Sequence, residues 1–250
     1  MNGMGWSIVS FVGAGPGDPE LITLKGLRRL READVVIHDR LIPRALLGEV
    51  RAGTEVIDVG KAPGRHCLGQ ESISRLIVDR AAAHTSVVRL KGGDPAIFGR
   101  LGEEIRAVRE AGLRFEVIPG ITAATAAAAL AGISLTERAL ASQVVLATGT
   151  DHSGGRPALL DWDLLARADA TAVFYMPMRG LSSITATLTA LGRDPRTPAI
   201  VVARVGTPDE RVVAGRLDDI AERARAAGVE SPAVLITGPT VAASAPLGVG

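Results

Sequence analysis

The feature of this chain that most restricts its fold is a repeated alternation of short apolar runs with longer amphipathic segments. Runs rich in Val and Ile predict strands over residues 7–12, 34–38, 55–59, 87–90 and 115–118. Between them, apolar residues recur at helical spacing, as in Leu24, Leu27 and Leu30 after the capping residue Thr23, and again over 72–83 and 103–111. Strands that alternate with helices form a mostly parallel sheet covered on both faces. We therefore predict an α/β fold.

A second set of elements follows Pro119 and Gly120, which interrupt the chain near its midpoint. Strands are predicted over 143–147, 172–175, 199–203 and 234–236, and helices over 121–130, 181–191 and 217–227. A chain of 250 residues is also long enough for two domains of ordinary size. We therefore expect two α/β domains, residues 1–118 and 119–250.

The composition is that of a globular protein with a substantial core, and it excludes several classes of function. Hydrophobic residues make up 47% of the chain and charged residues 22%, which excludes a disordered chain. The formal net charge of +1 excludes nucleic-acid binding through bulk positive charge, so we expect no nucleic-acid partner. The single cysteine, Cys67, and four scattered histidines predict neither a disulfide framework nor a metal site.

The sequence has no obvious membrane or export segment. Its longest apolar stretch, residues 121–133, is shorter than the roughly 20 residues that a helix needs to cross a bilayer. Residues 1–11 carry no basic region of the kind that begins an export signal. We therefore expect a cytoplasmic protein without a membrane partner.

Glycine and charged residues gather directly after four predicted strands. These turns are Gly13–Asp18, Asp39–Arg40, Gly60–Lys61 and Lys91–Pro95. Because the carboxyl ends of parallel strands lie along one edge of a sheet, where ligands bind, the four turns predict a ligand site. The alternative interpretation is that glycine and charged residues simply end strands.

The first of these turns does not have the spacing of a dinucleotide-binding loop. Its glycines are Gly13, Gly15 and Gly17, which do not fit G-x-G-x-x-G. Pro16 has no N–H to donate to a phosphate, and Asp18 would repel one. A tight turn of this kind suits a neutral or cationic ligand.

Several segments carry motifs that occur together in one known family. They are VGAGPGD at 12–18, HDRL at 38–41, VGK at 59–61, RLKGGDPAIFG at 89–99, PGITAA at 119–124 and residues 132–136. Together they resemble the tetrapyrrole methylases, which transfer methyl groups to porphyrin-like carbon skeletons, and the resemblance extends from Val9 to about Val241. The combination of Asp39–Arg40–Leu41 with Gly60–Lys61 is most similar to the members that act on uroporphyrinogen III.

The resemblance implies two α/β domains, the first with a mostly parallel sheet and the second with a mixed sheet, and a cleft between them. It also implies a homodimer that uses S-adenosylmethionine and releases S-adenosylhomocysteine. Asp39 matches the family's proton acceptor and Lys61 its proton donor. The residues implied to bind the cofactor are Pro16, Gly92, Gly93, Asp94, Ile97, Thr122, Ala123, Met176 and Gly206.

The activity that the resemblance implies is the conversion of uroporphyrinogen III to precorrin-2 by two methyl transfers, in siroheme or cobalamin biosynthesis. The substrate is an octacarboxylate, so Arg40, Arg65 and Arg100 are expected to bind its carboxylates. The alternative for each arginine is a solvated surface charge. A carboxylate such as Asp39 can accept the proton that the methylated ring system must lose.

Three positions depart from the family pattern. Glu137 and Thr150 stand where histidines are common, and Pro177 stands where a glycine usually follows the methionine. These changes leave two alternatives: a methyltransferase of a later cobalamin precursor or other tetrapyrrole, and a non-catalytic tetrapyrrole-binding module. The chain also lacks the N-terminal oxidase and chelatase region of fused siroheme synthases, so we expect it to stop at the methylated product.

Overall fold

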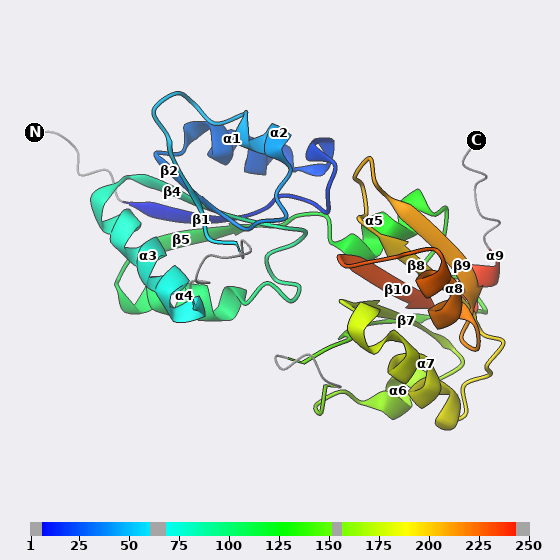
Figure 1. Ribbon diagram of the computed structural model, residues 1–250. Helices are drawn as coiled ribbons and strands as arrows, with labels where there is room; N and C mark the ends of the chain where they lie inside the picture. Colours follow the sequence, from blue (N-terminus) through cyan, green and yellow to red (C-terminus); the bar gives the residue numbers. More distant parts are fainter. Residues whose placement is uncertain (1–6, 61–68, 152–156, 244–250) are drawn as a thin grey trace, which may run out of the picture. The chain divides into compact units, whose positions relative to one another are not determined.

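The chain forms two compact units, Met1–Thr122 and Ala123–Gly250, each with a sheet and a core of its own (Figure 1). The computed structural model describes residues 7–60, 69–151 and 157–243. The first unit ends a few residues beyond the expected boundary at residue 118, because it includes the turn that follows its last strand.

The sheet of the first unit was predicted to be mostly parallel, and all of its strand pairs are parallel. It contains β1 (Ile8–Gly13), β2 (Val35–His38), β3 (Glu55–Asp58), β4 (Ser86–Lys91) and β5 (Arg114–Ile118) in the order β3-β2-β4-β1-β5. β1, β2 and β4 are buried along almost their whole length. This burial explains why they read as continuous apolar runs in the sequence.

Helices cover both faces of this sheet (Figure 1). On one face lie α1 (Leu24–Glu32) and α2 (Arg44–Leu47), with the short 3-10 helix η1 (Pro19–Leu21) before α1. On the other face lie α3 (Gln70–Ala83) and α4 (Leu101–Glu110). The sequence pattern had not indicated α2, because it is only one turn long.

Helix α1 begins at the predicted cap, since the Thr23 hydroxyl accepts a hydrogen bond from the Gly26 amide at 3.1 Å. The spacing of Leu24 with Leu27 and Leu30 predicts one apolar face turned to the core, and for Leu24 this is wrong, because Leu24 is 83% exposed. The buried positions are Gly26 and Leu30, one turn apart. A Cβ at Gly26 would lie 2.9 Å from Val12 Cγ1, so the helix packs on β1 along the Gly26–Leu30 row and turns Leu24 outward.

The sheet of the second unit is mixed, which confirms the expectation from the resemblance. It contains β6 (Gln143–Thr148), β7 (Ala170–Tyr175), β8 (Pro198–Ala203), β9 (Arg211–Arg216) and β10 (Ala233–Thr237) in the order β6-β7-β10-β8-β9. Only β6 and β7 pair in parallel. The edge strand β9 was not predicted, because its exposed residues include two arginines and its apolar run is short.

One large apolar cluster holds the second unit together. Helices α6 (Trp162–Ala166), α7 (Leu181–Ala190) and α8 (Ile220–Ala226) bury their apolar residues against β7, β8 and β10, and the 3-10 helix η2 (Met178–Gly180) leads into α7. Helix α5 (Ala123–Leu130) contacts β10, and α9 (Thr240–Ala243) contacts β8 and β10. Within the described ranges, no helix combines the length and hydropathy that a membrane span requires.

Candidate functional site

The turns that follow β1, β4 and β5 contact one another at the carboxyl edge of the first sheet. Gly93 donates its N–H to Gly15 O at 2.7 Å, and Gly15 donates to Gly93 O at 3.3 Å. Both glycines have positive φ, +79° for Gly15 and +64° for Gly93, which side chains rarely tolerate. Gly13 and Gly120 approach so closely that a Cβ on Gly13 would lie 2.6 Å from Gly120 Cα. The glycines of the motifs therefore let three turns touch.

The turns after β2 and β3 join the same edge. A Cβ on Gly60 would lie 2.3 Å from Arg40 Cβ, so these two turns are also in close contact. Asp39 donates its backbone N–H to Leu90 O at 3.3 Å, which attaches its turn to β4. The edge thus gathers the four turns that the sequence singled out, the Gly60–Lys61 turn as far as Gly60. Lys61 and Arg65, the expected proton donor and one expected substrate ligand, lie outside the described residues.

The expected cofactor residues of the first unit lie in or beside these turns. Asp94 shapes its own turn, because one carboxylate oxygen accepts from Ala96 N at 2.8 Å and the other from Gly120 N at 3.0 Å. Gly92 is exposed, and a Cβ built on it would meet no atom within 4 Å. Apart from Gly93, described above, the other expected cofactor residues of this unit are half-buried: Pro16, Ile97 and Thr122.

In the second unit, the expected cofactor residues Met176 and Gly206 follow β7 and β8. Both strands are antiparallel to β10, so they run in the same direction and end at the same edge of their sheet. The Tyr175 hydroxyl accepts from Ala124 N at 3.4 Å, which brings the residue before Met176 to the start of α5, where Ala123 lies. Met176 is 48% exposed and has φ +53°, a strained conformation for a residue with a side chain.

All three departures from the family pattern lie between helices and strands of this second unit. Pro177 is buried against Gly149, where a Cβ would lie 2.8 Å from Pro177 Cα. Thr150, the next residue, accepts at its carbonyl from the Thr148 hydroxyl at 2.7 Å. Glu137 is exposed and exchanges two backbone hydrogen bonds with Ala141.

A buried ionic cluster beneath Asp39 was missed by sequence reasoning. Arg89 donates from Nη2 to Asp39 Oδ1 at 2.5 Å and from Nε to Glu104 Oε1 at 3.1 Å. Lys91 donates to Glu104 Oε2 at 2.8 Å. Burial lowers the pKa of Lys91, as does the neighbouring charge of Arg89, while Glu104 opposes both effects. The carboxylate of Asp39 is therefore tied to charges in the protein interior.

The signal for this cluster was present in the sequence. Arg89 and Lys91 alternate with apolar residues inside a strand that is otherwise a buried run, and Lys91 is the last residue of β4 rather than the first of the following turn. Two cations on the same face of a buried strand favour a carboxylate partner in the interior. What the sequence did not indicate is which carboxylate this is.

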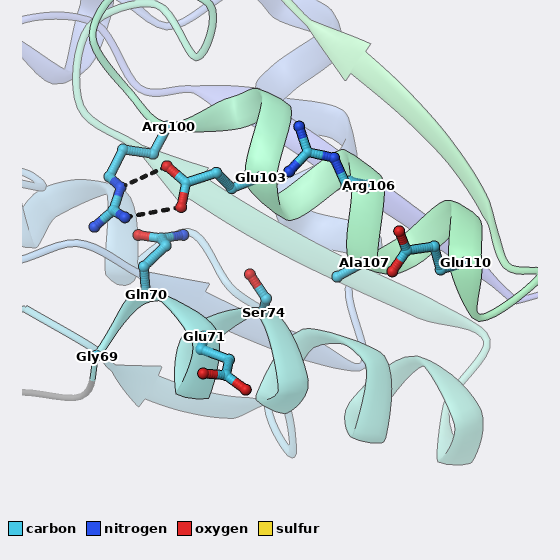
Figure 2. A pocket seen from close by; sticks show the side chains of 9 residues that line it. All are labelled: Gly69, Gln70, Glu71, Ser74, Arg100, Glu103, Arg106, Ala107 and Glu110. Carbon is cyan, nitrogen blue, oxygen red and sulfur yellow. Dashed lines mark hydrogen bonds and ion pairs between the residues drawn. The ribbon is translucent and has the colours of Figure 1, made fainter.

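A cavity of about 430 Å³ lies between α3 and α4, next to this cluster. Figure 2 shows Gln70 and Ser74 pointing from α3 toward α4, where Arg100 and Glu103 face each other. Two hydrogen bonds of 2.8 Å join these residues, and they raise the pKa of Arg100 and lower that of Glu103. The expected substrate ligand Arg100 therefore lies on the cavity wall, and Arg40 is exposed in its turn. The cavity is lined by Gly69, Gln70, Glu71, Ser74, Arg100, Glu103, Arg106, Ala107 and Glu110.

Residues 9–221 match the family model described as tetrapyrrole (corrin/porphyrin) methylases. The chain belongs to the tetrapyrrole methylase family. This tetrapyrrole methylase is 46% identical over 233 residues to a siroheme synthase of Pseudoalteromonas atlantica, covering 93% of this chain and 50% of that protein. It is 43% identical over 234 residues to a uroporphyrinogen-III C-methyltransferase of Bacillus subtilis, covering 94% and 48%. The chain therefore spans about half the length of these curated relatives.

Solved structures of similar proteins share both units of this tetrapyrrole methylase. A uroporphyrin-III C-methyltransferase from Thermus thermophilus, crystallised with S-adenosylhomocysteine, has a TM-score of 0.81 and 42% identity, covering 95% of this chain and all of that chain. A cobalt precorrin-4 methyltransferase of cobalamin biosynthesis has a TM-score of 0.84 and 30% identity, covering 94% and 95%. The fold is therefore common to methyltransferases of different tetrapyrroles.

Proposed function

We propose that this chain is an S-adenosylmethionine-dependent C-methyltransferase that converts uroporphyrinogen III to precorrin-2. The observation that carries the proposal is the meeting of five turns at one sheet edge, with Asp39 among them. The names and identities of the relatives support it. Identity is 42% to the Thermus uroporphyrin-III enzyme and 30% to the precorrin-4 enzyme, which favours uroporphyrinogen III.

The residues present suit the methyl donor. The glycine turns leave backbone exposed at Gly92, where no side chain would block a ligand. Pro16 and Asp18 disfavour a phosphate and are compatible with a cationic sulfonium ligand. From the resemblance we propose donor-binding roles for nine residues: Pro16, Gly92, Gly93, Asp94, Ile97, Thr122, Ala123, Met176 and Gly206.

When bound, S-adenosylmethionine supplies an electrophilic methyl group, which a pyrrole carbon takes with its own electron pair as the carbon–sulfur bond breaks. The protein's task is then to align the substrate and remove a proton from the cationic product. Asp39 suits this task, because Arg89 engages only Oδ1, and within the described residues Oδ2 accepts no hydrogen bond. Its side chain is 37% exposed, so it can reach a substrate at the sheet edge.

The eight carboxylates of the substrate require cations at the rim. Arg40 and Arg100 are the described arginines that we propose for this role, and we retain Lys61 as proton donor and Arg65 as a further ligand. Arginine forks match carboxylates in geometry as well as charge. The pairing of Arg100 with Glu103 means that a substrate carboxylate would compete with an existing partner.

The test is incubation of the purified chain with S-adenosylmethionine and freshly reduced uroporphyrinogen III, followed by mass spectrometry. We expect a gain of two methyl groups. Methylation only of a later cobalamin precursor would support the first alternative, which the similarity to the precorrin-4 enzyme keeps open. Calorimetric binding of the donor without turnover on any tetrapyrrole would support a binding module.

From the resemblance we also propose that the chain is a cytoplasmic homodimer. Light scattering after size-exclusion chromatography tests the assembly. A measured mass equal to one chain, 25.8 kDa, would contradict the dimer.

A further inference from the structure

The carboxylate of Glu104 is the centre of the buried cluster in the first unit. It is fully buried and accepts from Arg89 at 3.1 Å, from Lys91 at 2.8 Å and from Gln70 at 3.2 Å. With Asp39 included, the cluster holds two cations and two carboxylates, so its charges balance.

Stability alone is a poor explanation for this arrangement. Arg89 and Lys91 lie on the same face of β4 as Val87, and this face packs against α3 and α4 through an apolar cluster. Replacing a buried ionic group with apolar residues of similar volume is often neutral or stabilising, because desolvation offsets the attraction. The ionic residues therefore need a further role, and their contact with Asp39 indicates one.

Arg89 has its guanidinium fixed by all three of its nitrogens. Nε donates to Glu104, Nη1 donates to the backbone carbonyl of Leu90 at 3.2 Å, and Nη2 donates to Asp39 Oδ1 at 2.5 Å. A planar guanidinium group with a hydrogen bond from each of its three nitrogens is held in one orientation. It therefore holds Asp39 Oδ1 in one place at the edge of the sheet.

We propose that Glu104 is a positioning residue that acts through Arg89 to hold the Asp39 carboxylate in the geometry required for proton transfer. The inference rests on the proposed function and adds residues to its site. Glu104 does not reach the substrate in this scheme; it orients the arginine that orients the acceptor. Gln70, on the wall of the neighbouring cavity, completes the set of donors around Glu104.

The primary test is Glu104→Gln, with Glu116→Gln as its matched control. Glu116 has the same kinds of donor, an arginine, a lysine and a neutral side chain, in Arg29, Lys25 and Ser10, but makes no contact with Asp39. We expect Glu104→Gln to lower kcat about ten-fold to a hundred-fold, with the calorimetric Kd for S-adenosylmethionine unchanged. Glu116→Gln should lower thermal stability and leave kcat unchanged.

A double-mutant cycle separates positioning from a general structural effect. If Glu104 acts through Asp39, adding Glu104→Gln to Asp39→Asn should reduce kcat no further than Asp39→Asn alone. The proposal would be overturned if the loss of kcat in the double variant were the product of the two single-variant losses. A kcat in Glu104→Gln equal to that of the parent would also overturn it. If Glu104→Gln does not fold, Glu104→Gln with Lys91→Met restores the charge balance and should show the same loss and the same non-additivity.

A second measurement does not depend on turnover. In protein labelled with carbon-13 at the aspartate carboxyls, Asp39→Asn identifies the Asp39 resonance. We expect that resonance to move in Glu104→Gln and to stay in place in Glu116→Gln. If the parent chain methylates no tetrapyrrole, the proposed function fails, and this resonance still decides the positioning claim. An unmoved Asp39 resonance in Glu104→Gln would refute it.

Discussion

Glu116 on β5 accepts from three donors, two on α1 and one on the neighbouring strand β1. Arg29 Nε lies 2.5 Å from Oε1, Ser10 Oγ lies 2.9 Å from Oε1, and Lys25 Nζ lies 2.7 Å from Oε2. Burial by itself would raise the pKa of Glu116, but the hydrogen bonds from Arg29, Lys25 and Ser10 outweigh it. Together they lower the pKa from 4.5 to about 2.

This shift predicts a contribution to stability with a defined pH dependence. A fall in pKa of this size corresponds to about 3 kcal/mol, and screening of the half-exposed Lys25 reduces the expected value to about 2 kcal/mol. Because the folded-state pKa lies below the unfolded value, the contribution is fully present above about pH 4.5. It is lost as the pH falls from there toward about 2.

Urea unfolding of the parent and Glu116→Gln, followed by circular dichroism, measures this contribution. We expect the variant to be less stable by about 2 kcal/mol near pH 7, and the two free energies of unfolding to converge only as the pH falls to about 2. The convergence follows because protonated Glu and Gln are both neutral and similar in shape. A difference that does not change with pH would show that the loss comes from packing, and the electrostatic reasoning would be wrong.

Three further outcomes follow from the structure. Asp39→Asn should lower methylation about a hundred-fold or more while the calorimetric Kd for the methyl donor stays near that of the parent; comparable turnover would remove Asp39 from the proton-acceptor role. Gly92→Ala should fold normally, because its Cβ meets no protein atom, and weaker donor binding by this variant would place the ligand against that backbone. Gly93→Val strains a φ of +64° and should abolish donor binding. Normal donor affinity in Gly93→Val would contradict the proposed site. Arg193 donates to three buried carbonyls, and burial lowers its pKa to about 10. Arg193→Met should therefore lower the free energy of unfolding by about 3 kcal/mol. An unchanged melting temperature in this variant would show that these hydrogen bonds do not stabilise the fold.

Local patterns in the sequence were sufficient for most of the fold. Strands such as β1 and β4 are continuous apolar runs because they are buried on both faces, and their order of alternation with helices dictates a parallel sheet. Once the sheet is parallel, the turns after its strands must lie along one edge. The position of Asp39 beside the glycine turns follows from that rule and from the residues alone.

Packing decided the features that local patterns predict poorly. Leu24 has the spacing of a core residue, but the close approach of Gly26 to Val12 rotates α1 so that Leu24 faces outward. The edge strand β9 is formed by its pairing with β8, since its own residues alternate only weakly. In both cases the deciding partner lies on another element.

The ionic cluster depends on tertiary structure in the same way. Arg89 meets Asp39 from 50 positions away, and Lys91 meets Glu104 from 13 positions away. Two buried cations in one strand indicate a carboxylate partner, because an unpaired buried charge is costly. Which carboxylate it is depends on how α4 packs on β4, and hydrophobic periodicity does not contain that information.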